Sequence, residues 1–183
     1  MMYLLHRNLG RVHPDCFPTI FKTMVRPHLE INSLACAPML MKDMDTLERV
    51  QRRATKRVYG LSNTAYPDRL RKLNMFSLSY RRTRGDMIMT HKILHTPDHP
   101  CLSIIHRKAP DNLRGHTLKL EHQRSKLAVR HHAFGDRVPR TWNYLPSEVV
   151  NATSTTQFKF LFDCNFSHAA YVPNEHILGP NHQ

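Results

Sequence analysis

Features that define several familiar classes of protein are missing from this sequence. Its apolar runs fall well short of the ~18 residues that a membrane-spanning helix requires. Glycine is scarce, at 6 of 183 residues, which excludes a collagen-like or glycine-rich disordered chain. The four cysteines have neither CxxC spacing nor the density of a disulfide scaffold. We therefore expect an intracellular protein, nuclear or cytoplasmic, that does not contact a membrane.

The motifs of common enzyme classes are missing as well. The sequence contains no Walker loop, no dinucleotide-binding fingerprint and no nucleophile elbow. Two-metal phosphoryl transfer needs closely placed carboxylates, and the nearest pair, Asp43 and Asp45, would point to different faces of a helix. The fourteen histidines do not approach the four-ligand pattern of structural zinc. We expect no catalytic residue, metal site, cofactor or small-molecule ligand in this chain.

Acidic residues are also in short supply. Lys and Arg number 27 against 14 Asp and Glu, a formal net charge of +13. The excess is concentrated at positions 49–92, where twelve Lys or Arg occur with only two Asp, a net charge of +10. Positions 1–48 are neutral, and positions 93–183 carry +3. This concentration favours a polyanionic partner, and a basic surface that is merely solvated is the alternative.

The clearest helix is predicted over positions 39–59. Apolar residues recur there at steps of three and four, the spacing of one helix face: Leu40, Met44, Leu47, Ala54 and Val58. At about 100° per residue, five basic residues fall on the opposite side: Arg49, Arg52, Arg53, Lys56 and Arg57. Acids, among them Glu48, lie in the first half, as the helix dipole favours. The helix should be apolar on one side and strongly cationic on the other.

Two further helices are predicted around this one. A helix over 13–33 precedes it, and Pro27 should kink or end that helix because proline lacks an amide hydrogen. Another helix follows over 77–94, with Ser77 as its N-terminal cap. Its apolar residues form two stripes, which indicates a helix wedged between neighbours. Gly85 in its interior indicates close approach by another backbone, since glycine costs about 1 kcal/mol relative to alanine in a helix.

The C-terminal half combines a predicted hairpin with short helices. Alternation at 116–121 predicts a strand, paired with 125–130 across a turn. Trp142 belongs to a predicted core helix, and Ser154 should cap a final helix that buries Phe158. The fold class is therefore expected to be mainly α, a bundle-like arrangement of helices with a small β-hairpin in the C-terminal half.

Four regions are predicted along the chain. Positions 1–94, which include a short helix at 66–73, form the basic helical region. Positions 95–112 contain three prolines and no periodicity, so they are interpreted as a linker loop. Positions 113–166 hold the hairpin and the remaining helices, and 167–183 form a frayed tail.

The predicted binding surface extends beyond the cationic helix to six nearby bases: Arg69, Arg71, Lys72, Arg81, Arg82 and Arg84. Arginine dominates this set, and its planar guanidinium suits bidentate binding of phosphate. Aromatic residues close to the bases are few, so base stacking is weakly signalled. The pattern predicts helices that bind a nucleic-acid backbone.

Six sequence blocks, taken together, resemble one protein family. They are MVRPHLE at 24–30, LERVQRRATKRVYGL at 47–61, Tyr-x-x-Arg-Leu at 66–70, SLSYRRTRGDMIMTHKIL at 77–94, RGHTLKL at 114–120 and the run from Arg124 to Pro146. In this order and spacing they resemble the region downstream of the polymerase core in non-LTR (LINE-type) retrotransposon reverse transcriptases of the jockey-like kind.

The resemblance implies a thumb and post-thumb region, a mainly helical element that holds the template–primer duplex. The polymerase core of the family carries a catalytic Tyr/Phe-Ala-Asp-Asp turn and uses a divalent metal such as Mg²⁺. That turn has no counterpart in this sequence. We therefore expect a non-catalytic C-terminal fragment of an RNA-directed DNA polymerase. Its expected partners are RNA–DNA or duplex nucleic acid and the missing palm and fingers. The alternative is an orphaned structural or interaction fragment without independent activity.

Overall fold

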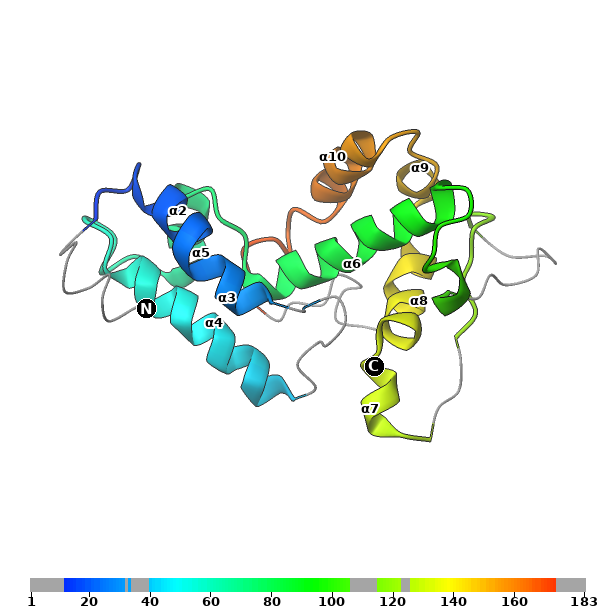
Figure 1. Cartoon of the computed structure of the whole chain (residues 1–183). Coiled ribbons are helices and arrows are strands. Elements are labelled where there is room, and N and C mark those ends of the chain that lie inside the picture. The colour runs from blue at the N-terminus through cyan, green and yellow to red at the C-terminus, as the bar shows by residue number, and fades with distance from the viewer. Residues whose placement is uncertain (1–11, 32, 34–39, 106–114, 123–125, 174–183) are drawn as a thin grey trace.

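Helices make up most of the part of the chain that the structure describes, which confirms the mainly α prediction. The structure is a computed structural model, and it describes residues 12–31, 33, 40–105, 115–122 and 126–173. Helix α6 runs through the middle of the molecule, with α2–α5 at one end and α8–α10 at the other (Figure 1). The elements are α2 (Phe17–Ile20), the π-helical turn η1 (Phe21–Val25), α3 (Arg26–Glu30), α4 (Met41–Lys56), α5 (Tyr66–Lys72), α6 (Leu78–His95), the 3₁₀ turn η2 (Leu102–Ile104), α7 (Ala128–His131), α8 (Phe134–Tyr144), α9 (Ser147–Val150) and α10 (Thr155–Asn165).

The N-terminal helix continues past Pro27. Segments α2, η1 and α3 follow one another without a gap, and the middle turn is π-helical. The Arg26 N–H donates there to the carbonyl of Phe21, five residues earlier. This wider turn accommodates the proline ring and its missing amide hydrogen. Phe17, Phe21 and Val25 remain buried beneath the helix.

Helix α6 begins where the sequence predicts, and its neighbours lie on several sides. The Ser77 hydroxyl caps it by accepting a hydrogen bond from the Tyr80 N–H at 3.3 Å. The helix contacts α4, α8 and α10 (Figure 1). Its buried residues occur along its whole length, from Leu78 to Leu94. The prediction that this helix is wedged between neighbours is confirmed.

The described residues form two apolar cores. The first combines α2, η1 and the end of α4 with α5 and the turn after it, and Phe21 and Met75 are almost fully buried there. The second joins α6 to α8, α9 and α10 around Trp142. Tyr171 packs against both cores. Along the chain, the change of core falls between Met75 and Tyr80, at the start of α6.

The predicted linker is partly packed into the fold. Ile105 is buried in the second core, directly after η2, and positions 106–112 lie outside the described residues. Of the predicted tail, Ala169 and Ala170 are also buried, and 174–183 lie outside the described residues. The division of the chain at 95–112 stays a prediction. Helix α6, which precedes this segment, packs mostly with the helices that follow it.

The predicted β-hairpin is wrong for the part of the chain that the structure describes. Residues 115–122 run along α8, and side chains of that helix bond to their backbone. The Asn143 side chain accepts from the Leu120 N–H at 2.7 Å and donates to the Leu120 carbonyl at 2.8 Å. The Trp142 indole N–H donates to the Leu118 carbonyl at 2.8 Å. These contacts bond the backbone of Leu118 and Leu120 to α8. Of the expected partner segment, residues 128–130 belong to α7, and residue 125 lies outside the described residues.

Two glycines inside helices have opposite surroundings. At Gly85 in α6, an added Cβ would meet no atom within 4 Å, so the close approach predicted from the sequence is wrong. At Gly135 in α8, an added Cβ would lie 2.7 Å from the carbonyl oxygen of Ile104. Only the second position requires glycine for packing.

Alanine substitutions at these glycines should therefore change stability in opposite directions. Gly85→Ala should raise the free energy of unfolding by about 0.5–1 kcal/mol, because alanine is the better helix former and meets no obstacle. Gly135→Ala should lower it, because the backbone at Ile104 would have to move. Urea unfolding followed by circular dichroism measures both changes. A loss from the first substitution or a gain from the second would contradict the described packing.

Candidate nucleic-acid interface

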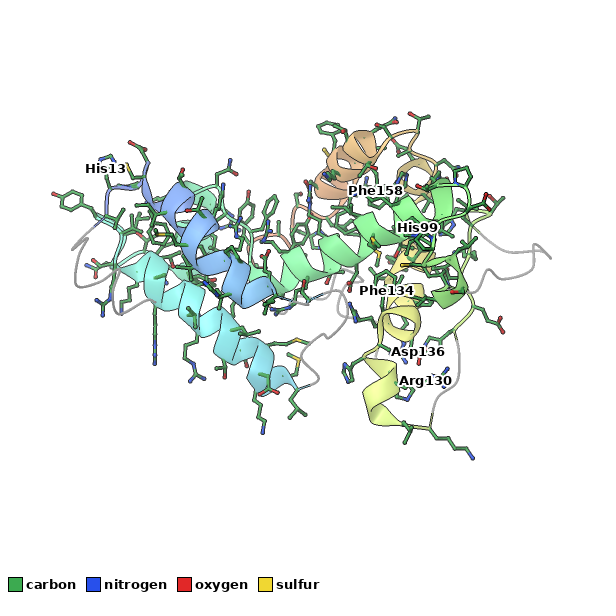
Figure 2. The ribbon with its side chains drawn as sticks, in the orientation of Figure 1. His13, His99, Arg130, Phe134, Asp136 and Phe158 are labelled. Carbon is green, nitrogen blue, oxygen red and sulfur yellow. The ribbon has the colours of Figure 1, made fainter. Side chains whose placement is uncertain are left out.

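The predicted cationic side of α4 is exposed to solvent. Five bases lie on it, at steps of one, three and four, and cover about 12 Å along the helix axis. None of them forms an ion pair with a described residue. Figure 2 shows the side chains of α4 extending outward from the ribbon. The five are Arg49, Arg52, Arg53, Lys56 and Arg57.

The opposite side of α4 is buried but more polar than predicted. Ala54 and Val58 are buried, as the apolar stripe indicates, whereas Leu40 at its start is 49 % exposed. The centre of the buried side consists of Glu48 and Gln51, at 1 % and 0 % exposure. Buried polar groups need hydrogen-bond partners, so their contacts determine how α4 is held.

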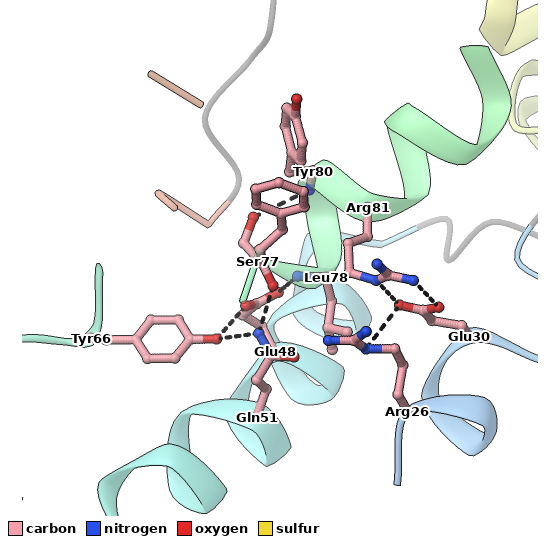
Figure 3. A network of polar contacts seen from close by, with 10 residues as sticks. Arg26, Glu30, Glu48, Gln51, Tyr66, Ser77, Leu78, Tyr80 and Arg81 are labelled. Atoms are coloured by element: carbon pink, nitrogen blue, oxygen red, sulfur yellow. Dashed lines mark hydrogen bonds and ion pairs between the residues drawn. The ribbon is translucent and has the colours of Figure 1, made fainter. Parts of the chain in front are cut away.

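The Glu48 carboxylate connects three helices (Figure 3). One oxygen accepts a hydrogen bond from the Tyr66 hydroxyl of α5 at 2.5 Å, and the other accepts from the Leu78 N–H at 2.9 Å. Leu78 is the first residue of α6, where backbone amides lack helical partners and the helix dipole favours negative charge. Gln51 adds bonds to the Tyr66 hydroxyl at 3.2 Å and to the Phe76 carbonyl at 3.0 Å. The buried side of α4 is thus fastened to both α5 and α6.

Burial dominates the electrostatics around this carboxylate. It raises the pKa of Glu48 above the ordinary 4.5, while the hydrogen bonds from Tyr66 and Leu78 and the charge of Arg82 act in the opposite direction. Burial also raises the pKa of Tyr66, and the charge of Glu48 adds to that rise. Burial lowers the pKa of Arg82, which is only 9 % exposed. Arg82 therefore acts as a buried counter-charge rather than as a surface base.

Arg69, another predicted binding residue, lies inside the fold and is only 5 % exposed. Its guanidinium donates to the Thr64 carbonyl at 2.6 Å, to the Thr55 hydroxyl at 3.2 Å and to the Arg52 carbonyl at 3.3 Å. These bonds tie α5 to the last turns of α4. Arg69 consequently positions the cationic helix and is not part of its exposed surface.

Two further predicted bases are engaged by carboxylates distant in sequence. Arg81 forms a forked ion pair with Glu30 of α3, in which Nη2 and Oε2 are 2.9 Å apart (Figure 3). Arg84 binds both carboxylate oxygens of Asp163 in α10 at 2.7 Å. These pairs fasten α3 and α10 to α6. Either guanidinium would have to leave its carboxylate partner in order to bind phosphate.

The last two predicted bases lie at the end of α5. Arg71 is exposed and pairs with Asp68 at 2.6 Å, and its guanidinium lies 5.5 Å from the ring centroid of Tyr171. Lys72 is exposed and has no ion pair with a described residue. Of the eleven predicted residues, the five bases of α4 and Lys72 therefore remain exposed without a carboxylate partner in the described part of the chain.

Sequence reasoning missed these internal roles because it counted charge locally. Arg81 and Glu30 are 51 positions apart, and Arg84 and Asp163 are 79 positions apart. It also related Glu48 only to the helix dipole and did not predict its burial, because glutamate is rarely buried. One signal was available in the composition. With only 14 carboxylates for 27 bases, each carboxylate has many possible basic partners, including bases far away in the sequence.

Other kinds of site are not found in the described ranges. Among those residues, no group of three or more His, Cys, Asp or Glu could hold a metal ion. The helices seen there include none with both the length and the apolar character needed to cross a bilayer. Comparisons of the chain with family models, curated proteins and solved structures gave no match. The case for a function therefore depends on the exposed side of α4 and on what holds it.

Glu48 should make stability fall as pH rises. Because burial raises its pKa in the folded protein, the folded state holds this proton more tightly than the unfolded chain. The stabilising contribution is fully present below pH 4.5 and is lost as the pH rises through the folded pKa. Glu48→Gln removes this titration. Between about pH 5 and about pH 8, the free energy of urea unfolding should therefore decline more for the wild type than for the variant.

Glu148→Gln is the matched control, because it neutralises an exposed glutamate of α9. Its unfolding free energy should follow the wild-type pH dependence. Parallel pH curves for the wild type and Glu48→Gln would show that the carboxylate titrates as it does in the unfolded chain, which would contradict its burial.

Proposed function

We propose that this chain binds nucleic acid through the exposed side of α4, by contact with the phosphate backbone and without reading base sequence. The observation that carries the proposal is the division of α4 into two polar sides. One side holds Glu48 and Gln51 inside the fold. The other presents five bases that make no ion pair with a described residue, so no carboxylate there competes with phosphate.

The dimensions of the row of bases suit a nucleic-acid backbone. Duplex DNA carries about one phosphate charge per ~1.7 Å of its axis, so a basic row about 12 Å long meets several phosphates. Four of the five bases are arginine, whose guanidinium binds phosphate through two parallel hydrogen bonds. Tyr66 and Tyr80, two of the aromatic residues near the basic segment, are buried, which favours contact with the backbone over extensive base stacking.

The resemblance to LINE-type reverse transcriptases points to the same proposal. The block at 47–61 contains all five bases of α4. We propose a thumb-like, non-catalytic role for the chain, with RNA–DNA or duplex nucleic acid as the bound partner and a palm and fingers as its protein partner. This role belongs inside the cell, in the nucleus or the cytoplasm.

A salt titration tests the proposal directly. If all five bases contact phosphates of a DNA duplex, the logarithm of the binding constant should fall with the logarithm of salt concentration at a slope of about −4.5. Between about 50 and about 200 mM salt this slope corresponds to a loss of about 500-fold. Fluorescence anisotropy with a DNA duplex measures it, and an RNA–DNA duplex is titrated in parallel. A flat salt response would contradict phosphate binding.

Charge variants locate the binding surface. Replacing Arg49, Arg53, Lys56 and Arg57 with glutamine should reduce the slope to about −0.9, since one base of the row remains. Arg52 is retained because its guanidinium lies 5.1 Å from the centroid of the Tyr66 ring. Both the slope and the affinity at low salt should fall without loss of helicity.

The matched control removes the same charge elsewhere, from four lysines that lie outside α4. They are Lys22, Lys92, Lys126 and Lys159, each replaced by glutamine. This control should keep most of the wild-type slope. An equal loss in both variants would mean that net charge alone governs binding. A folded wild-type chain that binds neither duplex would favour the alternative of a structural or interaction fragment.

A further inference from the structure

Tyr59 is an exposed aromatic residue at the end of the basic row. Its side chain is 63 % exposed. It follows Arg57, the last base of the row, by two residues, so their Cα atoms are within ~7 Å. No ring stacking, cation–π contact or hydrogen bond links its side chain to a described residue. The ring therefore has no evident role in the described packing.

The backbone holds Tyr59 outward at a fixed place. The preceding residue, Val58, is buried at 2 % exposure and anchors the chain in the first core. The Tyr59 N–H donates to the Val12 carbonyl at 3.1 Å, beside the segment that carries His13 (Figure 2). Gly60 then adopts a φ of +74°, which turns the chain away. The aromatic ring is therefore presented by a bonded turn at the end of α4.

We propose, on the basis of the proposed function, that Tyr59 stacks on an unpaired nucleobase of the strand whose phosphates lie along α4. Bases inside a duplex already stack on two neighbours, whereas an unpaired base offers a free face. Every nucleobase has such a face, so stacking adds affinity without a sequence requirement. The row of bases would hold the backbone, and Tyr59 would distinguish nucleic acid with an unpaired base from a fully paired duplex.

The test compares two probes with the same number of phosphates. One is a blunt DNA duplex, and the other is a duplex with a short single-stranded overhang that carries 2-aminopurine. Wild-type protein should bind the overhang probe about 5- to 150-fold more tightly, the range expected for one stacked base, and should quench the 2-aminopurine fluorescence. Tyr59→Ala should lose both the preference and the quenching, and Tyr59→Phe should keep both.

Tyr144→Ala is the control, because Tyr144 is a 50 % exposed tyrosine on α8, away from the basic row. It should leave the preference for the overhang probe unchanged. If the wild type binds the blunt duplex with the expected salt dependence but Tyr59→Ala retains the overhang preference, the stacking role is overturned and the proposed function stands. If wild-type protein binds neither probe, the proposed function fails, and the inference fails with it.

Discussion

The fold depends on a carboxylate that has been removed from water. Glu48 accepts hydrogen bonds from Tyr66 of α5 and from the first amide of α6, and these bonds offset part of its desolvation. Apolar packing alone would let a helix rotate slightly about its axis. Hydrogen bonds have a defined direction and therefore prevent this rotation. Glu48 and Gln51 thus set the rotation of α4. Because that rotation is set, the five bases opposite them point into solvent.

The excess of positive charge is divided between structure and surface. Arg81 and Arg84 bind carboxylates of α3 and α10, and Arg137 of α8 binds both oxygens of Asp86 at 2.7 and 2.8 Å. Each of these pairs connects two helices, so removal of either partner would leave a partly buried charge uncompensated. The carboxylates used in these pairs are no longer available to α4. The bases of that helix form no ion pair with a described residue.

Local patterns predicted the helices well and the long-range contacts poorly. The caps at Ser77 and Ser154 are formed as expected, because a hydroxyl three residues before an amide is visible in sequence. Asn143 could not be foreseen as the partner of Leu120, and without it the alternation at 116–121 indicates a hairpin. Among the predicted site residues, those on α4 follow from helix periodicity. The internal roles of Arg81 and Arg84 do not, since their carboxylate partners are more than fifty positions away.

The coupling between Glu48 and Tyr66 is the most direct measure of how α4 is held. A double-mutant cycle of Glu48→Met and Tyr66→Phe, followed by urea unfolding at neutral pH, isolates it. Met has a similar length but cannot accept the hydroxyl hydrogen bond as a carboxylate does. If the buried bond fixes α4, the two substitutions should be non-additive, with an interaction energy of about 0.5–3 kcal/mol. Additive effects would contradict a direct bond between Glu48 and Tyr66, and with it the role of Glu48 in turning the basic side outward.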